Sequence, residues 1–363
     1  MRIHQLLIGA GPGDAVTESA RSIQRALARS VESRVYAVHV HPDLADEIGE
    51  LADFPRDGTA DDVLVFHVSI GEPGLVDFLR RSPERIVLCY HNITPARFFD
   101  ELDPDFASKL RDGRWELRPL TTMAVGAVAA SHFNAAELAE LGMGNVAVAA
   151  PPLHLDRLQH ISTDCPIAEE LAAIDDPVIA MIGQMHPHKR PDLAVDTHHL
   201  LNVNHIPRAR LWMAGPFRNE RYAGAVQRHI DSLRLDTVRV LGHVSDTQLA
   251  ALYRRADLLL LPSEHEGFGV PLIEAFGFGV PVVTRAYGAI PETADGAALI
   301  LPPDATAADL CEAVARVLGD PAVTVELVAR GRDRAAQFSA EATLANWLGA
   351  LAGVLRNGTP ARP

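Results

Sequence analysis

The sequence predicts an α/β protein built from two doubly wound domains, each with a parallel sheet. Three observations indicate this class. Short apolar runs rich in Val, Ile and Leu alternate with longer helical patterns along the whole chain. The runs are continuously apolar rather than alternating, which is typical of strands buried on both faces. The length of 363 residues suits two domains of ordinary size.

The first half of the chain contains six of these runs and two clear helical patterns. We expect strands at Ile3–Gly9, Arg34–Val40, Val63–Ser69, Arg85–Tyr90, Met123–Ala130 and Val146–Ala149. The helices are expected at Ala15–Ala28 and at Ala135–Leu141, where Gly142 serves as the C-terminal cap. Repeated βα units of this kind produce parallel sheets with helices on both faces.

The second half repeats the pattern after a break. Pro151–Pro177 is rich in proline and charge, and we interpret it as a linker with about one helix. Strands are then expected at Val178–Gly183, Arg210–Gly215, Val238–Leu241, Leu258–Leu261, Val282–Thr284 and Ala298–Leu301. The pattern predicts domains over residues 1–160 and 161–338, followed by a tail segment over residues 339–363. In that tail, Glu341–Leu355 carries leucines and a tryptophan at helical spacing, with Ser339 as its N-cap.

Composition argues against several classes of function. The net charge of −14 disfavours nucleic-acid binding, which needs a basic surface to release counterions. Three cysteines, far apart in sequence, indicate reduced thiols and no disulfide framework. The apolar run at the N-terminus is too short for a signal peptide, and no run reaches the ~18 residues of a membrane span. We therefore expect a cytoplasmic chain without a transmembrane segment.

The loop that follows Leu258–Leu261 carries the clearest chemical signal. Gly267 and Gly269 leave backbone N–H groups open to a ligand. Pro271 suits the first turn of the helix that follows, which Gly277 or Gly279 would end. A glycine loop that leads into a helix N-terminus is a site for a phosphate group.

Two carboxylates accompany this phosphate loop. Glu266 lies just before the glycines, and Glu274 lies in the first two turns of the predicted helix. An ionised carboxylate accepts hydrogen bonds from sugar hydroxyls, so the loop as a whole suits a phosphorylated sugar. For Glu274 alone, capping or charging the helix N-terminus is the better interpretation, and the functional interpretation is favoured only for the whole arrangement of strand, glycine loop, proline and two glutamates.

A second loop, from Gly183 to Pro191, contains a rare residue type. Lys109 and Lys189 are the only lysines among 33 basic residues. An ammonium at Lys189, beside Arg190, is well placed to neutralise a diphosphate leaving group. His186 and His188 in this loop have no third metal ligand nearby in sequence, so we expect no metal there.

Two features of the first half face the same strand ends. Gly9, Gly11 and Gly13 form a strand-to-helix turn, although their spacing departs from the dinucleotide fingerprint. His91 follows the run Arg85–Tyr90. From position alone, a structural role for His91 is favoured over a functional one.

Taken together, these residues resemble a retaining glycosyltransferase of the GT-B fold, in glycosyltransferase family 4. The most specific element is an E-x7-E motif, met by Glu266 and Glu274. Further matching positions are Gly183 with Lys189, Met213–Gly215, Gly242–Ser245, Leu249 with Tyr253, and Gly288 with Pro291 and Glu292. In the first half, Gly11–Ala15, His91 and Ser131–Asn134 match as well.

The resemblance implies a role for each matching position. Glu266 would contact hydroxyls of the donor sugar, Lys189 would bind the diphosphate, and His91 would lie beside the transferred sugar. These three are the expected catalytic residues. The expected donor-binding residues are Gly11, Gly13, Gly183, Gln184, Arg190, Gly215, Gly267, Phe268, Gly269 and Glu274, with Glu274 on the ribose. The family often has Arg where this chain has Gln184, and Arg190 is our candidate for the replacement cation.

The resemblance also implies the reaction. A hexose would move from a nucleotide-diphosphate sugar to an acceptor hydroxyl, with retention of configuration and without a metal or other cofactor. The two domains would face a cleft, with the acceptor on residues 1–160, the donor on 161–338, and the tail helix crossing back onto the first domain. Asp103 and Asp105 fit the D-x-D pattern of metal-dependent transferases by chance. The implied partners are the donor and a carbohydrate or glycolipid-type acceptor, and the chain is either free in the cytoplasm or peripheral at the inner membrane face.

Other interpretations remain open from sequence. Another GT-B enzyme, such as a nucleotide-sugar epimerase or a phosphorylase-like transferase, would share the phosphate loop. A nicotinamide-dependent oxidoreductase would use Gly9–Gly13, with Asp43 after the second strand. A non-catalytic sugar-nucleotide binder would keep the site without turnover. The nucleotide base, the sugar, the acceptor and the oligomeric state are not indicated by any motif.

Overall fold

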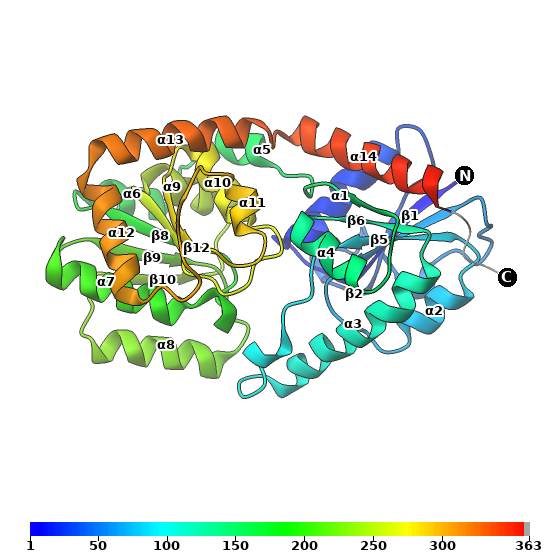
Figure 1. Ribbon diagram of the computed structural model, residues 1–363, viewed down its shortest axis with the longest axis horizontal. Helices are drawn as coiled ribbons and strands as arrows, with labels where there is room; N and C mark the ends of the chain where they lie inside the picture. The colour runs from blue at the N-terminus through cyan, green and yellow to red at the C-terminus, as the bar shows by residue number, and fades with distance from the viewer. Residues whose placement is uncertain (359–363) are drawn as a thin grey trace. The chain divides into compact units, whose positions relative to one another are not determined.

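The computed structural model describes residues 1–358 and divides the chain into two compact units. Unit 1 comprises residues 1–153 together with the C-terminal segment from residue 340, and unit 2 comprises His154–Ser339. Residues 359–363 of the expected tail segment lie outside the described residues. In Figure 1, unit 1 holds the blue and cyan parts of the chain and the red helix, and unit 2 holds the green to orange parts.

Within the described residues, unit 1 contains a parallel sheet of seven strands in the order β3-β2-β1-β4-β5-β6-β7. The strands are β1 (Ile3–Ala10), β2 (Val35–Val40), β3 (Gly49–Glu50), β4 (Val63–Val68), β5 (Arg85–Tyr90), β6 (Gly126–Ala129) and β7 (Val146–Val148). β1, β4 and β5 lie at the centre and are buried along almost their whole length, which explains their continuous apolar sequences.

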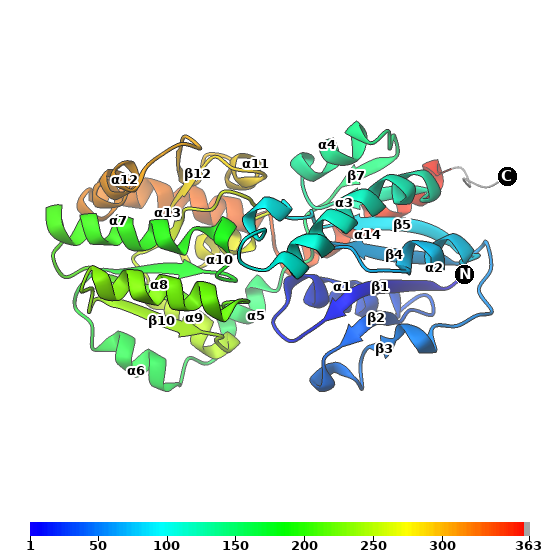
Figure 2. The same ribbon diagram turned by 90° about the horizontal axis from the view of Figure 1, so that it is seen from below.

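Helices cover both faces of this sheet. They are α1 (Ala15–Leu27), α2 (Leu75–Arg81), α3 (Pro104–Met123), α4 (His132–Glu140) and α14 (Ala340–Asn357). Short 3₁₀ turns lie at Pro42–Leu44, Leu51–Asp53 and Ala96–Phe98. Leucines of α2 and α3 share one apolar cluster with β1, β4 and β5, and Figure 2 shows these two helices on the same side of the sheet. α1 and α14 share a second cluster on the opposite face.

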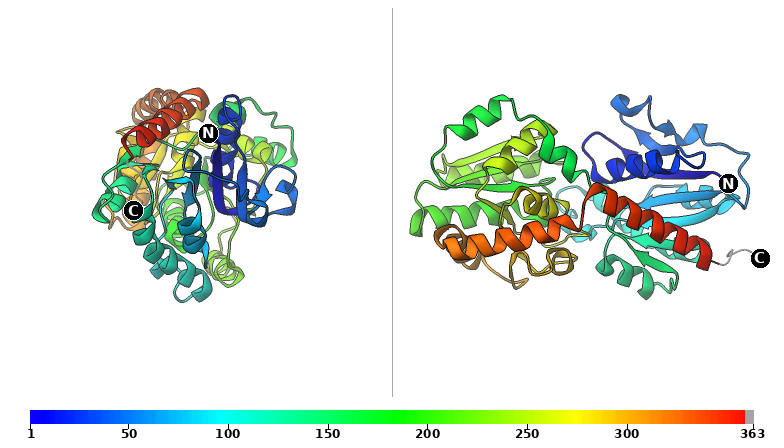
Figure 3. Two further views of the ribbon diagram at one scale, coloured as in Figure 1. Left: turned by 90° about the vertical axis from the view of Figure 1, so that its right-hand side faces the viewer. Right: turned by 90° about the horizontal axis from the view of Figure 1, so that it is seen from above.

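The C-terminal helix α14 packs on unit 1, although it follows unit 2 in sequence. Trp347, Leu351 and Val354 are buried against valines of the central strands. Asn145 Nδ2 also donates a hydrogen bond to the carbonyl of Val354, at 2.9 Å. Figure 3 shows the red helix running along this sheet. The apolar stripe at helical spacing therefore has its partner surface on the sheet of unit 1, chiefly at β6 and β7.

Unit 2 repeats the architecture with a six-stranded parallel sheet in the order β10-β9-β8-β11-β12-β13, counted over residues 154–339. The strands are β8 (Val178–Ile182), β9 (Arg210–Ala214), β10 (Val238–Gly242), β11 (Leu258–Leu261), β12 (Val282–Arg285) and β13 (Leu299–Leu301). The helices are α5 (Leu155–His160), α6 (Pro166–Ala172), α7 (Pro191–Asn204), α8 (Glu220–Ser232), α9 (Asp246–Arg255), α10 (Val270–Phe278), α11 (Ile290–Ala294), α12 (Ala307–Gly319) and α13 (Pro321–Ala336). A 3₁₀ turn lies at Pro187–Lys189.

The structure confirms the predicted class of two parallel, doubly wound sheets and differs from the prediction in detail. The segment Pro151–Pro177 contains two helices, α5 and α6, rather than one helix in a linker. α5 packs on α9 and α10, and the division between the units falls at residue 153 instead of 160. The expected strand Met123–Ala130 is shorter because α3 continues to Met123. Among residues 1–358, no helix combines the length and apolar character that a bilayer crossing needs.

Candidate active site

The two loops predicted to bind the donor lie side by side in unit 2. β8 and β11 are neighbouring parallel strands, so the loops after them leave the same edge of the sheet. The backbone N–H of Glu264 donates to the carbonyl of His188 at 2.7 Å and joins the loops directly. Residues from two distant parts of the sequence are therefore held at one strand edge.

Lys189 and Glu266 form the central contact between these loops. Lys189 Nζ lies 2.6 Å from Glu266 Oε1, and Ser263 donates its hydroxyl to the same oxygen at 2.8 Å. The side chains are largely buried, at 20% exposed for Lys189 and 7% for Glu266. Burial reduces screening by water, so this pair holds both side chains more firmly than a surface ion pair would. Ser263 was not singled out by the sequence, since a serine in a loop is common.

The glycine loop leads into α10 as expected. Gly269 is the N-cap residue of α10 with φ +94°, a left-handed conformation that favours glycine, and Pro271 lies in the first turn. The free N–H groups of this helix end supply the positive end of a dipole that attracts a phosphate. Gly279, with φ +72°, ends the helix. Gly277 lies inside it, where a Cβ would approach Leu155 Cδ1 to 2.5 Å.

A further glycine fixes the backbone of Glu266. A Cβ on Gly288 would lie 2.2 Å from the carbonyl oxygen of Glu266. The next residue, Ala289, donates its N–H to that same oxygen at 2.9 Å. The turn after β12 therefore packs backbone to backbone on the Glu266 loop, and only glycine fits at this approach. The sequence showed Gly288 as a motif position without this reason.

Glu274 is held by a buried tyrosine. Tyr253, which is fully buried, donates its hydroxyl to Glu274 Oε2 at 2.8 Å. Burial raises the pKa of Glu274, and the hydrogen bond from Tyr253 opposes that rise. Tyr253 is thus a positioning residue for the second carboxylate of the motif.

The candidate replacement cation Arg190 has acidic partners. Its guanidinium bonds to both carboxylate oxygens of Asp192, with the shortest contact at 2.8 Å, and also to Glu264. Arg285, which is buried, donates to the carbonyl of Pro262 and lies 3.4 Å from Glu264. Arg190 is consequently engaged with carboxylates, and the loop Pro262–Gly269 is clamped at its start by Arg285.

The other residues of unit 2 that the sequence predicts to bind the donor lie in or beside these two loops. Gly183 has φ +135° and open space where a Cβ would be, while Gln184 beside it is exposed. Gly215, with φ +140°, packs on Gly183, because a Cβ there would lie 1.8 Å from the Gly183 carbonyl oxygen. The ring of Phe268 contacts Phe338 edge to face at 5.8 Å. The side chain of Phe268 is therefore used in packing, and its backbone remains in the glycine loop.

In unit 1, the first glycine loop joins β1 to α1. A Cβ on Gly9 or Gly11 would meet no atom within 4 Å, and Gly13 has φ +71°. Asp14 caps α1 by accepting from the N–H of Thr17 at 2.8 Å, and burial raises the pKa of Asp14. The open space at Gly9 and Gly11 leaves room for a ligand beside the backbone, while the N–H of Gly11 itself donates to Thr17 Oγ1 at 3.2 Å.

His91 follows β5 and belongs to a buried polar cluster. Its Nε2 lies 2.9 Å from His67 Nδ1 and 3.5 Å from Cys89 Sγ. His67 Nε2 in turn lies 2.9 Å from Gln5 Oε1. Burial lowers the pKa of His91 to about 4. Sequence reasoning found His91 and missed His67 and Gln5, because both lie inside apolar strands where a polar residue gives no motif.

Two other polar features serve the fold rather than the site. Asp103, from the D-x-D pattern, caps α3 by accepting from the N–H of Phe106 at 3.1 Å.

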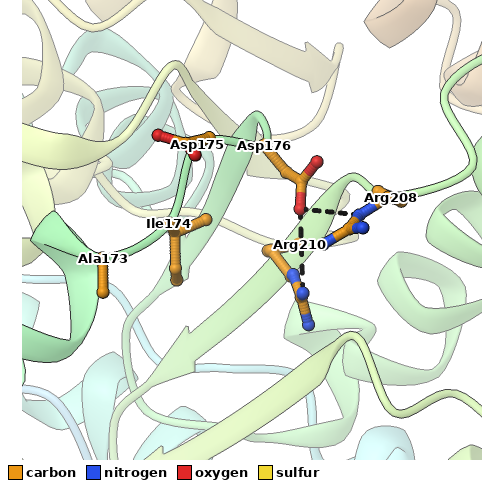
Figure 4. A pocket seen from close by; sticks show the side chains of 6 residues that line it. All are labelled: Ala173, Ile174, Asp175, Asp176, Arg208 and Arg210. Carbon is orange, nitrogen blue, oxygen red and sulfur yellow. Dashed lines mark hydrogen bonds and ion pairs between the residues drawn. The ribbon is translucent and has the colours of Figure 1, made fainter.

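A recess of about 310 Å³ lies just before β8 and β9, at the strand ends opposite to the candidate loops (Figure 4). In this recess, Asp176 bonds to Arg208 at 3.2 Å. The recess is lined by Ala173, Ile174, Asp175, Asp176, Arg208 and Arg210.

Comparison with known families identifies unit 2. Residues 167–337 match the family described as glycosyl transferases group 1. This segment is a group 1 glycosyl transferase domain. The match begins in α6 and ends just after α13, so it includes both candidate loops, the E-x7-E pair and the strands that carry them.

Curated relatives agree with this assignment. The D-inositol 3-phosphate glycosyltransferase of Kineococcus radiotolerans is 34% identical over 196 residues, which are 47% of this chain and 43% of that protein. The O-antigen chain mannosyltransferase B of Escherichia coli is 33% identical over 165 residues, which are 44% of this chain and 42% of that protein. In both cases, the matched stretch is less than half the length of the relative.

A solved structure extends the likeness to almost the whole chain. HepE of Anabaena, in complex with UDP and glucose, superposes with a TM-score of 0.77 at 16% identity, covering 97% of this chain and 99% of that one. At this identity the likeness concerns the fold. The GT-B class predicted from the sequence is confirmed, with two Rossmann-like units of parallel strands.

Proposed function

We propose that this chain is a glycosyltransferase that moves a hexose from a nucleotide-diphosphate sugar to an acceptor hydroxyl. One observation carries the proposal. Lys189 and Glu266 are in contact beside the glycine loop that opens α10. In this arrangement, the cation and the helix N-terminus can bind a diphosphate. The carboxylate can accept hydrogen bonds from sugar hydroxyls. The family of residues 167–337 and the names of the relatives support the same activity.

Each residue of the site then has a task. The α10 N-terminus and Lys189 bind the diphosphate, and Glu266 accepts hydrogen bonds from hydroxyls of the donor sugar. Glu274, oriented by Tyr253, holds the ribose. Because Arg190 is bonded to Asp192 and Glu264, we assign it a role in loop structure rather than in phosphate binding.

The reaction follows from these tasks. The bond between the anomeric carbon and the diphosphate breaks, and the acceptor oxygen attacks from the face that the diphosphate leaves, so the configuration is retained. The acceptor proton is released, and the nucleoside diphosphate carries the electron pair of the broken bond. Lys189 and the α10 dipole stabilise the charge that develops on the diphosphate, which is the task that a metal performs in other transferases. We therefore propose a metal-independent mechanism.

Unit 1 supplies the other part of the proposal. We assign His91 to the transferred sugar and the backbone of Gly11 and Gly13 to the donor. The acceptor is a carbohydrate or glycolipid-type hydroxyl, as suggested by the names of the inositol-phosphate and O-antigen relatives. A chain that is free in the cytoplasm or peripheral at the inner membrane face fits such acceptors.

A panel of sugar nucleotides tests the proposal. Thermal shift and donor hydrolysis are measured with UDP-, GDP- and ADP-linked hexoses, with NAD as a comparison and with EDTA in a parallel series. We expect at least one sugar nucleotide to raise the melting temperature and to be hydrolysed slowly, with or without EDTA. Anomeric NMR of the product then reports retention. Stabilisation by NAD alone, or no response to any member, contradicts the proposal, and an epimerised sugar nucleotide as the product identifies an epimerase instead.

A further inference from the structure

Three polar side chains form a row across the centre of the unit 1 sheet. Gln5, His67 and His91 lie on β1, on β4 and just after β5, which are neighbours in the sheet. Gln5 and His67 are fully buried, at 0% and 1% exposed. The contacts from Gln5 Oε1 to His67 Nε2 and from His67 Nδ1 to His91 Nε2 are both 2.9 Å. Buried polar atoms in such a row must be matched as donor and acceptor.

The orientation of the Gln5 amide, at one end of the row, fixes which atom donates and which accepts in every hydrogen bond of the row. Gln5 Nε2 donates to the carbonyl of Ala20 at 2.9 Å, which orients the amide and leaves Oε1 toward His67. An amide oxygen only accepts, so His67 must donate from Nε2. A neutral imidazole with its proton on Nε2 accepts at Nδ1. His91 must therefore carry its proton on Nε2 and donate it to His67.

Burial favours the neutral form of both rings. Burial, reinforced by the neighbouring histidine, lowers the pKa of His67 well below its usual value. Burial alone lowers the pKa of His91 to about 4. With both rings uncharged, each keeps one donor and one acceptor, and the chain of hydrogen bonds has a single direction.

The same atoms do not match a metal site. His67, His91 and Cys89 bring three ligand-type atoms within 4.8 Å of one another. The two ring nitrogens, however, lie 2.9 Å apart, whereas nitrogens on a tetrahedral zinc ion are separated by about 3.3 Å. Burial also raises the pKa of Cys89 to about 12, which keeps the thiol protonated. The separation and the protonated thiol both favour a hydrogen-bonded pair.

The backbone after His91 is fixed as well. Asn92 has φ +82°, an uncommon conformation for a residue other than glycine. Its side chain donates to Asn134 Oδ1 at 2.9 Å and to Glu137 Oε2 at 2.8 Å. Tyr90 donates to the same Glu137 oxygen at 2.6 Å. Ring and backbone of His91 are thus held from two sides.

We propose that His67 and Gln5 are positioning residues that fix His91 as the Nε2–H tautomer, so that Nδ1 is the nitrogen that accepts a hydrogen bond from a hydroxyl of the bound sugar. Within residues 1–358, His91 Nδ1 makes no hydrogen bond to the protein. It is also not among the fully buried polar atoms that lack a partner, so it remains accessible to a ligand. The role toward a sugar rests on the proposed function, whereas the tautomer is a property of the free protein.

NMR of the imidazole nitrogens tests the tautomer without any substrate. A long-range ¹⁵N–¹H spectrum is recorded on the free full-length protein at pH 7, and the His91→Gln variant identifies the His91 signals. We expect a protonated Nε2 and an unprotonated Nδ1 for His91. An Nδ1–H tautomer, an even mixture of tautomers or a charged ring at pH 7 overturns the proposal.

Paired variants test the positioning role. His67→Asn keeps an acceptor near the position of Nδ1, and His67→Leu removes it at similar volume. We expect His67→Leu to lower kcat for donor hydrolysis roughly tenfold to hundredfold with little change in KM, and His67→Asn to recover most of that loss. In His67→Leu, the His91 spectrum should show both tautomers. His4 is also buried but lies on β1. The variant His4→Leu therefore controls for destabilisation and should leave kcat unchanged.

The outcomes separate this proposal from the proposed function. If the wild-type protein hydrolyses no sugar nucleotide, the proposed function fails, and the NMR spectrum still decides the tautomer. If His67→Leu is folded and keeps both the kcat of His4→Leu and the wild-type His91 tautomer, the positioning role is wrong even for an active transferase.

Discussion

Lys189 Nζ donates a hydrogen bond to Glu266 Oε1 over 2.6 Å, and this contact joins two loops whose residues are 77 positions apart. The second lysine of the chain, Lys109, has an exposed side chain and reaches Glu72 only at 3.9 Å. In a chain whose other basic residues are all arginines, the buried lysine is therefore the one with a specific partner. A compact ammonium fits between Glu266 and a diphosphate, whereas the larger planar guanidinium does not share that geometry.

Lys189→Arg should lower kcat by roughly tenfold to hundredfold, because the longer guanidinium displaces Glu266 from its contacts with Ser263 and with sugar hydroxyls. The measurement is the steady-state rate of donor hydrolysis. Lys109→Arg makes the same chemical change at an exposed site and should keep the wild-type rate. Equal rates for both variants would show that Lys189 is an accident of composition.

Glu266→Ala should abolish turnover more than it weakens nucleotide binding, because Glu266 is assigned to the transferred sugar and not to the nucleotide. Turnover is followed by donor hydrolysis, and binding of the free nucleoside diphosphate by calorimetry. Glu312→Ala removes an exposed carboxylate elsewhere in unit 2 and serves as the control. A parallel loss of nucleotide affinity and turnover would place Glu266 on the nucleotide instead.

Tyr253→Phe should weaken nucleotide binding by about tenfold and change kcat little. The variant removes the hydroxyl that donates to Glu274 and leaves a buried carboxylate without that partner, which costs about 1–3 kcal/mol. Calorimetric titration with the nucleoside diphosphate measures the effect. Tyr287→Phe, which keeps the ring beside Arg285, is the matched control. Unchanged affinity in Tyr253→Phe would argue against a ribose-binding role for Glu274.

The stability of the protein should fall as the pH drops from about 6.5 toward 4. Burial lowers the pKa of His91, His186 and His198 to about 4 each. Between pH 6.5 and 4, the unfolded chain binds protons that the folded chain does not, so the free energy of unfolding decreases as the pH falls. Melting temperatures recorded across this range at constant ionic strength measure the effect.

Three partly buried carboxyl groups act in the opposite direction. The pKa values of Asp14, Glu116 and Glu274 are raised, mainly by burial, so the folded state binds their protons first as the pH falls. The histidines outweigh them, because His67 and His188 also have pKa values well below normal. A melting temperature that stays constant or rises between pH 6.5 and 4.5 would mean that these histidines are not buried as described.

Removal of the residues after Ser339 should destabilise unit 1, because α14 covers its central strands. Trp347 is 1% exposed, so Trp347→Ala should lower the free energy of unfolding by about 3–5 kcal/mol. Trp115→Ala, at a tryptophan that is 73% exposed, should change it by less than about 0.5 kcal/mol. Denaturant unfolding compares the variants, and a shorter deletion of residues 359–363 is the control. An unchanged melting temperature after the full deletion would contradict this role of α14.

Local sequence was sufficient for most of the fold. Continuous apolar runs such as Leu258–Leu261 predict buried parallel strands, because a strand with helices on both faces has no solvent-facing side. The pattern failed where an element is short or buries little. β3 has two residues, and the helices α5 and α6 lie in a segment interrupted by prolines and charge. Such elements form because neighbouring elements offer a surface for packing. Their own sequences lack the hydrophobic periodicity from which a helix or strand is predicted.

The candidate site shows the same division. The sequence by itself placed Lys189, Glu266, Glu274 and His91 after strands, because ligands bind where parallel strands end and because glycine loops before helices bind phosphate. Only the tertiary structure decided which groups meet. It paired Lys189 with Glu266, joined Arg190 to Glu264, and placed Gln5 and His67 behind His91. The physical reason is that parallel pairing brings together residues separated by whole βα units, so the contact partners of a side chain are fixed by sheet order and not by neighbours in sequence.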